Sequence, residues 1–382
     1  MNGGRVQPEL DTSKCLPCLI VATGPFTTIT LNQDDELNVT LEEVNRHTYD
    51  RVRLCRTTMD VDVGLGPLPA LLTYTAAWVL PPVKGMTPLK ALDVVNRALF
   101  ELFLGGVRFD SASPEDVGEG FAYHTGYFMA FGGEVGGDSG FNFARLKALQ
   151  SADVSTFDSI CLVKPRSFTV DEINRALDIG RPISKLLPEL NPTVVLDGLT
   201  ALRSRRTTSS LIFLWAACET LLNRLWSDHV VPKGSTVANR QGFVKGRAWT
   251  AAHKAEVLFQ LGVLNESLYG KVGQVRKARN DVAHEGAVPT MPVCLMAADV
   301  FFCLLSLSVP ATDRDPIAEA GAPFGKPVRR QGKAEPMAWR HMPAVPGNER
   351  WGDAEYARFP EREWVELPTD VRQALGRPKE QG

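Results

Sequence analysis

The chain has 382 residues, of which 44% are hydrophobic, so it can bury a core larger than that of a typical single domain. Its 42 basic and 44 acidic residues leave a net charge of −2, so no global field attracts nucleic acid and any polyanion site must be local. The sequence has no stretch typical of a signal peptide and no apolar run long enough to cross a bilayer. We therefore expect a cytoplasmic protein with no membrane partner.

Cysteine usage also indicates a reducing compartment. The seven cysteines are an odd set, and the later ones lie in apolar runs such as LWAACETLL and VFFCLLSL, as is typical of buried, reduced thiols. The CLPC stretch (Cys15 and Cys18) has the spacing of a metal or redox site. No second CxxC or histidine pair completes a zinc site, so we expect no metal and no cofactor.

The first part of the chain carries mainly strand signals. Three stretches are rich in β-branched and aromatic residues, namely LIVATGPFTTITL, HTYDRVRLCRTTMDVDV and ALLTYTAAWVL. A helix is predicted over 88–104, where apolar residues recur every three or four positions before Gly105-Gly106. FAYHTGYFMAFGG and FDSICLVKP predict further strands around the loop GGEVGGDSG. We predict an α+β domain over 1–165 that acts as a sensor or substrate-selecting module.

Strand signals stop near Ser167, and helices follow. The predicted helices span 169–187, 193–205, 208–227, 250–262, 265–284 and 292–308. Residues 166–310 therefore form an all-α domain of the size of one compact bundle. Residues 311–382 are rich in Pro, Arg, Glu and Gly, which predicts an extended or disordered tail. The fold class is α+β, with a mixed strand and helix domain followed by a helical bundle.

The residues best suited to chemistry lie in VRKARNDVAHEG, 275–286. On a helix, Arg276, Asn280 and His284 are four apart and share one stripe, with Arg279 beside them. The neighbouring stripe is apolar and consists of Leu268, Val272, Val275 and Val282. The polar cluster therefore borders the packed face, where a partner surface can cover it.

These residue types suit the cleavage of a phosphodiester. Histidine titrates near neutrality, so it can accept a proton from a ribose 2′-hydroxyl or donate one to the leaving oxygen. Arginine offers paired donors to the phosphate oxygens, and asparagine can orient the histidine or add a neutral donor. The spacing also fits a solvated helix end, since His284 directly precedes Glu285-Gly286 and a histidine there favours the helix dipole.

The stretch resembles the signature of the HEPN superfamily (higher eukaryotes and prokaryotes nucleotide-binding), which is an Arg, a polar residue, a few more residues and a His. The match falls on Arg279, Asn280 and His284. The helix SSLIFLWAACETLLNRLW and the segment KAEVLFQLGVLNESLYGKVGQVRKARNDVAHEG are similar to the Apea-like branch, so the resemblance covers roughly 190–308. It implies a metal-independent endoribonuclease whose two subunits form one RNA-cleaving site. Two histidines related by a twofold axis can then divide the acid and base roles.

Two further residues are candidate supports for this site. Glu219 shares a helix face with Trp215 and Leu222, and the resemblance implies that it holds Arg279 or His284; a plain ion pair or an exposed edge is the alternative. Arg276 is expected to contact a substrate phosphate, although a solvated arginine is the common outcome at such positions. The RSRR cluster at 203–206 has the charge to touch a nucleic-acid backbone, yet such clusters are common at helix ends.

The resemblance therefore predicts a homodimeric endoribonuclease acting on RNA, in a bacterial defence or toxin system controlled by an antitoxin or a phage-derived trigger. Two alternatives stay open. One is a catalytically silent module that binds nucleotides or a partner protein as a scaffold. The other is a toxin that is active only when released by a separate partner. The first requires neither Arg279 nor His284 to be reactive.

Overall fold

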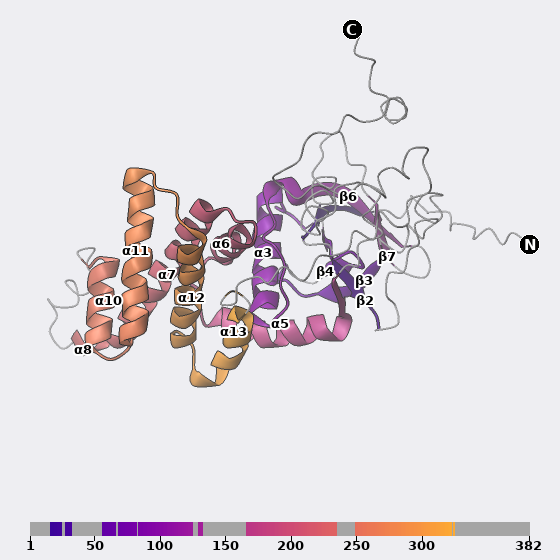
Figure 1. Ribbon diagram of the computed structural model, residues 1–382. Coiled ribbons are helices and arrows are strands. Elements are labelled where there is room, and N and C mark those ends of the chain that lie inside the picture. The colour runs from indigo at the N-terminus through magenta and orange to yellow at the C-terminus, as the bar shows by residue number, and fades with distance from the viewer. Residues whose placement is uncertain are drawn as a thin grey trace, which may run out of the picture.

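The computed structural model describes residues 16–24, 27–32, 56–65, 68–81, 83–124, 129–132, 166–234, 249–322 and 324. It has a strand-rich first part and a helical second part, so the predicted α+β class is confirmed. Figure 1 shows the sheet at one end of the molecule and helices α10 and α11 at the opposite end. The loop GGEVGGDSG and the strand predicted over FDSICLVKP lie outside the described residues, apart from the first glycine of that loop.

Six strands form an antiparallel sheet in the order β3-β4-β5-β1-β6-β7. Their bounds are β1 (Leu16–Val21), β3 (Thr57–Val61), β4 (Ala70–Thr73), β5 (Trp78–Leu80), β6 (Val117–His124) and β7 (Met129–Gly132). Two further strands, β2 (Thr27–Thr30) and β8 (Arg166–Thr169), pair in parallel as a separate ribbon. β8 lies beyond the point where the sequence signals for strands fade, because it depends on pairing with a strand far away in the sequence.

The stretch 70–80, expected to be one strand, folds into the hairpin of β4 and β5. Ala76 adopts a φ of 59° at the turn. The Thr73 hydroxyl accepts the backbone N–H of Ala77 at 3.0 Å, and the Thr23 hydroxyl donates to the carbonyl of Ala76 at 2.7 Å. These buried side-chain contacts hold a left-handed alanine that local preference disfavours.

The predicted helices are present, with ends that differ from the expected ones by a few residues. Their bounds are α3 (Pro88–Leu104), α5 (Val170–Lys185), α6 (Pro192–Arg203), α7 (Thr207–His229), α10 (Ala251–Gln260), α11 (Glu266–Glu285) and α12 (Met291–Leu307). Shorter elements are η2 (Pro114–Asp116), α8 (Val231–Gly234), η4 (Ala311–Asp313) and α13 (Arg314–Gly321). Side-chain caps fix several starts; Thr169, for example, forms a capping box with Glu172. None of the helices in the described ranges has the length and apolar character needed to cross a membrane.

The beginning of the expected tail is folded. In α13, Ile317 and Ala320 are buried, and Phe324 lies against the rings of Phe302 and Phe103 at centroid distances of 5.6 and 6.4 Å. These few apolar residues recur every three or four positions within a polar stretch, so the composition of 311–382 conceals them. The rest of the tail, from 325, lies outside the described residues.

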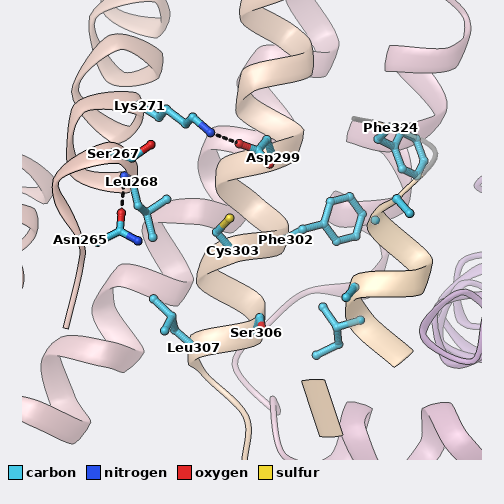
Figure 2. A pocket seen from close by; sticks show the side chains of 14 residues that line it. Asn265, Ser267, Leu268, Lys271, Asp299, Phe302, Cys303, Ser306, Leu307 and Phe324 are labelled. Carbon is cyan, nitrogen blue, oxygen red and sulfur yellow. Dashed lines mark hydrogen bonds and ion pairs between the residues drawn. The ribbon is translucent and has the colours of Figure 1, made fainter. Parts of the chain in front are cut away.

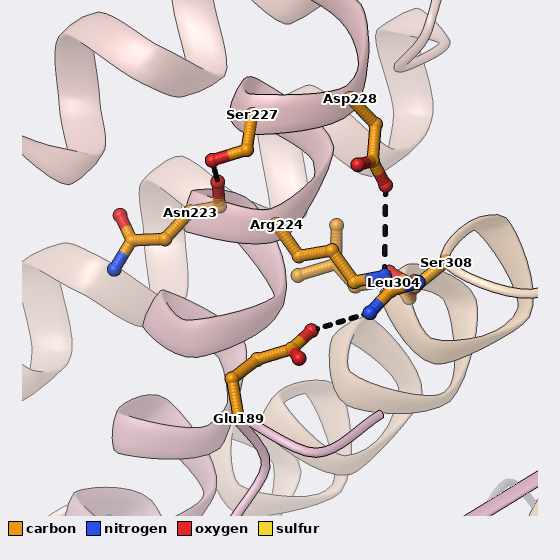
Figure 3. Close-up of polar contacts among 7 residues, drawn as sticks. All are labelled: Glu189, Asn223, Arg224, Ser227, Asp228, Leu304 and Ser308. Atoms are coloured by element: carbon orange, nitrogen blue, oxygen red, sulfur yellow. Dashed lines mark hydrogen bonds and ion pairs between the residues drawn. The ribbon is translucent and has the colours of Figure 1, made fainter. Parts of the chain in front are cut away.

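One hydrophobic core runs from the sheet into the helices, including Val21 of β1, Leu99 of α3 and Phe301 of α12. Ion pairs tie the helices together at its edge. Arg224 of α7 pairs with Glu189, in the turn before α6, at 2.7 Å and with Asp228 at 3.5 Å (Figure 3). The division of the chain at residue 165 stays a prediction.

Helices α3 and α5 approach each other at two glycines. A Cβ at Gly105 would overlap the backbone of Ala176, and a Cβ at Gly180 would overlap the carbonyl of Glu101. Beside this crossing, Arg181 pairs with Glu101 at 3.1 Å, and burial raises the pKa of Glu101 despite the arginine. The close packing of α3 on α5 therefore requires the absence of a side chain at both positions.

We predict that Gly180→Ala destabilises the chain strongly, by about 1–3 kcal/mol or more, because the helices must separate to admit the methyl group. The matched control is Gly270→Ala, on α11, where no atom lies within 4 Å of the new Cβ. This variant should be more stable by about 0.5–1 kcal/mol through the better helix propensity of alanine. Denaturant unfolding measures both. Equal stabilities would contradict the close approach of the helices.

Candidate functional site

Helix α11 carries the residues that the sequence singles out. It starts at a cap in which Asn265 accepts the backbone N–H of Leu268 at 2.8 Å. It ends at Gly286, whose φ of 67° is the left-handed conformation usual for a glycine after a helix. His284 therefore lies in the last turn, and a loop over 286–290 leads to α12.

The packing of α11 changes along its length. Its buried residues are Leu268, Val272 and Val275, all in the first half of the helix. The same alternation of four and three residues continues through Arg279 and Val282, which are only partly buried. Arg279 thus continues the packed apolar stripe. From the sequence we expected it beside the polar stripe of Arg276, Asn280 and His284. Beyond Val275 the rest of the chain covers the stripe only in part, although Val282 still packs against the core.

Arg279 and Asn280 contact each other directly. The guanidinium donates from Nη1 to Asn280 Oδ1 at 3.2 Å, and both side chains are partly buried. Within the described part of the chain, this is the sole polar contact of Arg279, which leaves most of its N–H donors available. His284 is exposed and has no hydrogen-bond partner among the described residues.

The three signature residues do not converge within one chain. Asn280 and His284 are four residues apart and share a stripe, as predicted. Arg279 and His284 are five residues apart, which corresponds to about 140° around the axis of a regular helix. A phosphate that contacts both groups of one subunit would have to wrap around the helix end. Their convergence on one cleft therefore needs a second surface.

Arg276 lies in the same stripe, close to a tight polar pair. The Tyr269 hydroxyl donates to Glu256 of α10 at 2.5 Å, and the Tyr269 ring stacks on Phe259 at 4.7 Å. The hydrogen bond to Glu256 raises the pKa of Tyr269, while the charge of Arg276 lowers it. Arg276 has no carboxylate partner in the described ranges.

Glu219 is partly buried on α7, on a face with the buried residues Trp215 and Leu222. No hydrogen bond or ion pair joins it to Arg279 or His284 among the described residues. Burial raises the pKa of the neighbouring Cys218 thiol, and the charges of Glu219 and Cys303 raise it further. The supporting role of Glu219 stays a prediction.

A pocket that no sequence motif indicates lies at the other end of α11. The pocket has a volume of about 550 Å³ and lies between α11, α12 and α13 (Figure 2). Lys271 of α11 and Asp299 of α12 form an ion pair at 2.6 Å on its wall, and Cys303 and Phe302 also line it. Arg279, Asn280 and His284 are not part of this wall.

The thiols and possible metal ligands show no further centre. Cys18, Cys218 and Cys294 are buried and free, as the sequence predicts, and Cys303 is half-buried and free. Burial raises the pKa of Cys18 to about 12. Cys15, the other half of CLPC, lies outside the described residues. Across the described ranges, no three His, Cys, Asp or Glu residues gather where they could hold a metal ion.

Comparison with known proteins adds no relative to this picture: no family model, no curated protein and no solved structure matches the chain.

Proposed function

We propose that the chain is a metal-independent endoribonuclease of the HEPN type, active as a homodimer through its helical region. The observation that carries the proposal is the partly covered second half of α11. There a partly buried Arg279, bonded to Asn280, continues the packed stripe where its cover is incomplete, and His284 is exposed one turn later. A cation and a half-covered valine in core register suit a surface that a second subunit closes.

A twofold axis near this surface also removes the geometric difficulty of a single chain. Arg279 and His284 of one subunit diverge around the helix, but the partner helix supplies a second copy of each group. The phosphate can then contact an arginine of one chain and a histidine of the other. Two imidazoles also allow one to act as base while the other acts as acid.

Each residue has a role in the cleavage that we propose. One His284 accepts the proton of the ribose 2′-hydroxyl, whose oxygen attacks phosphorus, and the other His284 donates a proton to the departing 5′-oxygen. Arg279 stabilises the charge that develops on the phosphate oxygens, and Asn280 orients Arg279 through the bond at 3.2 Å. The products are a 2′,3′-cyclic phosphate and a 5′-hydroxyl. Arg276 contacts a flanking phosphate.

Further cations lie at the same end of the helical region. Cys294 donates to the carbonyl of Thr207 at 3.3 Å, so α7 and α12 begin side by side, and α12 starts just after α11 ends (Figure 1). Arg205 and Arg206, of the RSRR cluster, are exposed in the turn before α7. Lys277 is exposed on α11. These side chains offer a local path for an RNA backbone on a chain of nearly balanced charge.

The biological setting follows from the family resemblance. We infer a cytoplasmic defence or toxin protein whose first domain senses a trigger or selects the substrate, and whose nuclease is restrained until an antitoxin leaves or a phage component arrives. The free thiols support a reducing compartment. This inference rests on analogy between families.

A silent scaffold is the second candidate, and a specific observation favours it. Arg279 and His284 diverge by about 140° on their own helix, so one subunit alone presents no catalytic pair. In that case the partly covered stripe would bind a partner protein, and Arg279 would serve only to pair with an acid of that partner.

The first prediction concerns the reaction. The purified full chain should cut single-stranded RNA in excess chelator and leave 2′,3′-cyclic phosphate ends, because imidazole and guanidinium groups replace the metal. Mass spectrometry of the fragments identifies the ends. A strict requirement for a divalent metal, or fragments with 3′-hydroxyl ends, would contradict the mechanism.

The second prediction concerns the residue. His284→Ala should lower the cleavage rate by at least about 100-fold, the range expected for loss of general acid–base catalysis. The melting temperature should hardly change, because the side chain is exposed. His229→Ala is the matched control, since His229 is also an exposed histidine in the last turn of a helix. Comparable activity of the two variants would refute the assignment of His284.

The third prediction concerns the dimer. Equal amounts of wild-type chain and His284→Ala chain, mixed and allowed to exchange subunits, should keep about a quarter of the wild-type activity, because a site with one histidine is inactive. Independent sites would keep about half. Rates measured across mixing ratios distinguish a quadratic from a linear dependence, and a linear one would exclude a shared site.

A further inference from the structure

Three arginines and one carboxylate gather where the strands meet the helices. Arg108 and Asp110 lie in the segment after α3, Arg166 is the first residue of β8, and Arg203 is the last residue of α6. Three separate segments of the sequence supply these residues, and none of them belongs to α11. Contacts between them define a second site, independent of the proposed nuclease centre.

Arg166 is held firmly at this junction. Its Nη2 donates to the carbonyl oxygen of Arg108 at 2.6 Å and to the Thr27 hydroxyl at 3.1 Å. The guanidinium also lies 5.8 Å from the ring centroids of Phe109 and Phe168. The contacts of Arg166 with the described residues include no carboxylate.

Arg203 links the same segment to the helices. It forms an ion pair with Asp110, whose side chain is 8% exposed, whereas that of Arg203 is 34% exposed. The Asp110 N–H donates to the carbonyl of Gly24 at 2.6 Å, and the Ser111 N–H donates to the Thr200 hydroxyl at 2.9 Å. The backbone at Asp110 and Ser111 is thus fixed by two hydrogen bonds, the ion pair with Arg203 holds the carboxylate, and the Arg203 side chain is partly open to solvent.

The positive charge at the junction exceeds the negative charge. The Arg108 guanidinium lies 5.2 Å from the centroid of the Phe324 ring and makes no hydrogen bond or ion pair with any described residue. The Nε–H groups of Arg108 and Arg166 are buried and have no acceptor there. Burial, and then the charge of Arg108, lowers the pKa of both Arg166 and Arg203 to about 10. Three cations therefore lie close enough to repel each other, and of the three only Arg203 has a carboxylate partner among the described residues, namely Asp110.

Stacking on aromatic rings does not account for this arrangement. A ring stabilises the face of a guanidinium, but the N–H donors lie in its plane and still need acceptors. Among the described residues these buried donors have no acceptors and the cations outnumber the carboxylate, an arrangement that costs free energy unless other groups complete it. A bound anion would supply both.

We propose that Arg108, Arg166 and Arg203 form a binding site for a small phosphate-bearing ligand at the junction of the β2–β8 ribbon with α6. The three arginines and Asp110 leave two positive charges, which match a phosphate monoester of charge about −1.5 to −2 at neutral pH. Guanidinium forks also fit the geometry of phosphate oxygens. Inorganic phosphate and a nucleoside monophosphate share this chemistry. The ligand would join the strands to the end of α6.

The test uses the full chain and measures both melting temperature and calorimetric binding. The probes are inorganic phosphate, AMP and sodium chloride at matched ionic strength. Phosphate and AMP should raise the melting temperature above the value in chloride, because a ligand that binds the folded state stabilises it. A stronger effect of AMP would indicate a nucleotide, and equal effects would indicate free phosphate.

Arg108→Met separates binding from structure. Because Arg108 has no polar partner among the described residues and repels its neighbours, the variant should melt at the wild-type temperature or above it in phosphate-free buffer. Its affinity for the probes should fall by at least about tenfold, as expected for the loss of a charge-assisted contact. Arg97→Met, which removes an exposed arginine of α3, is the control of equal charge and should bind like wild type.

Two results would overturn the proposal. One is that wild type gains no stability from phosphate or AMP beyond that in chloride. The other is that Arg108→Met and Arg97→Met bind the probes equally well. Because neither readout involves RNA cleavage, the outcome is independent of the nuclease proposal.

Discussion

The burial of helix α3 is the constraint on which the rest of the structure depends. Ten of its 17 residues are buried, because strands cover one side while α5 and α6 cover another. The helix also sets the segment that follows it. The buried amide of Asn96 accepts the N–H of Ala112 at 2.8 Å and donates to its carbonyl at 3.0 Å. A satisfied buried amide of this kind permits one arrangement of the segment and little else. The position of Arg108 and Asp110 therefore follows from the packing of a helix that carries no functional group itself.

Helix α11, at the opposite end of the molecule, is much less buried than α3. Helix α11 is anchored by its first half, through three buried residues and the ion pair of Lys271 with Asp299, while its second half has no buried residue. In this second half the apolar register continues with Arg279 and Val282, which are only partly buried, although Val282 packs against the hydrophobic core. A second subunit is the simplest surface that would complete the burial of these two side chains. The packed first half of α11 thus holds the helix in place, so its second half can carry the proposed site.

Features that depend on neighbouring residues could be predicted from the sequence. Contacts between residues far apart in the sequence could not. Helical periodicity located α3, α7 and α11, since each has apolar residues repeated over several turns. The same rule placed Asn280 and His284 on one stripe, but it could not show where the cover over α11 becomes incomplete, which is a property of α7 and α12. β8 depends on pairing with β2, and the fold of 311–324 depends on a pocket for Phe324 among other aromatic rings. Arg108, Arg166 and Arg203 come together only through tertiary structure, so no spacing rule could join them.

The pattern of ion pairs between arginines and acidic residues supports the proposed functions of the α11 site and of the arginine cluster at Arg108. Acidic residues outnumber basic ones, so carboxylates are not scarce in this chain. Arg181 and Arg224, which join helices, have carboxylate partners at 3.1 and 2.7 Å. Arg108 and Arg279 have none among the described residues, although both are partly buried and desolvation makes an uncompensated cation costly. Among the described residues, the arginines that join helices have carboxylate partners and these two have none, and counter-charges from outside the chain would account for the difference. On α11 that anion would be an RNA phosphate, and at the junction it would be a small phosphate ester.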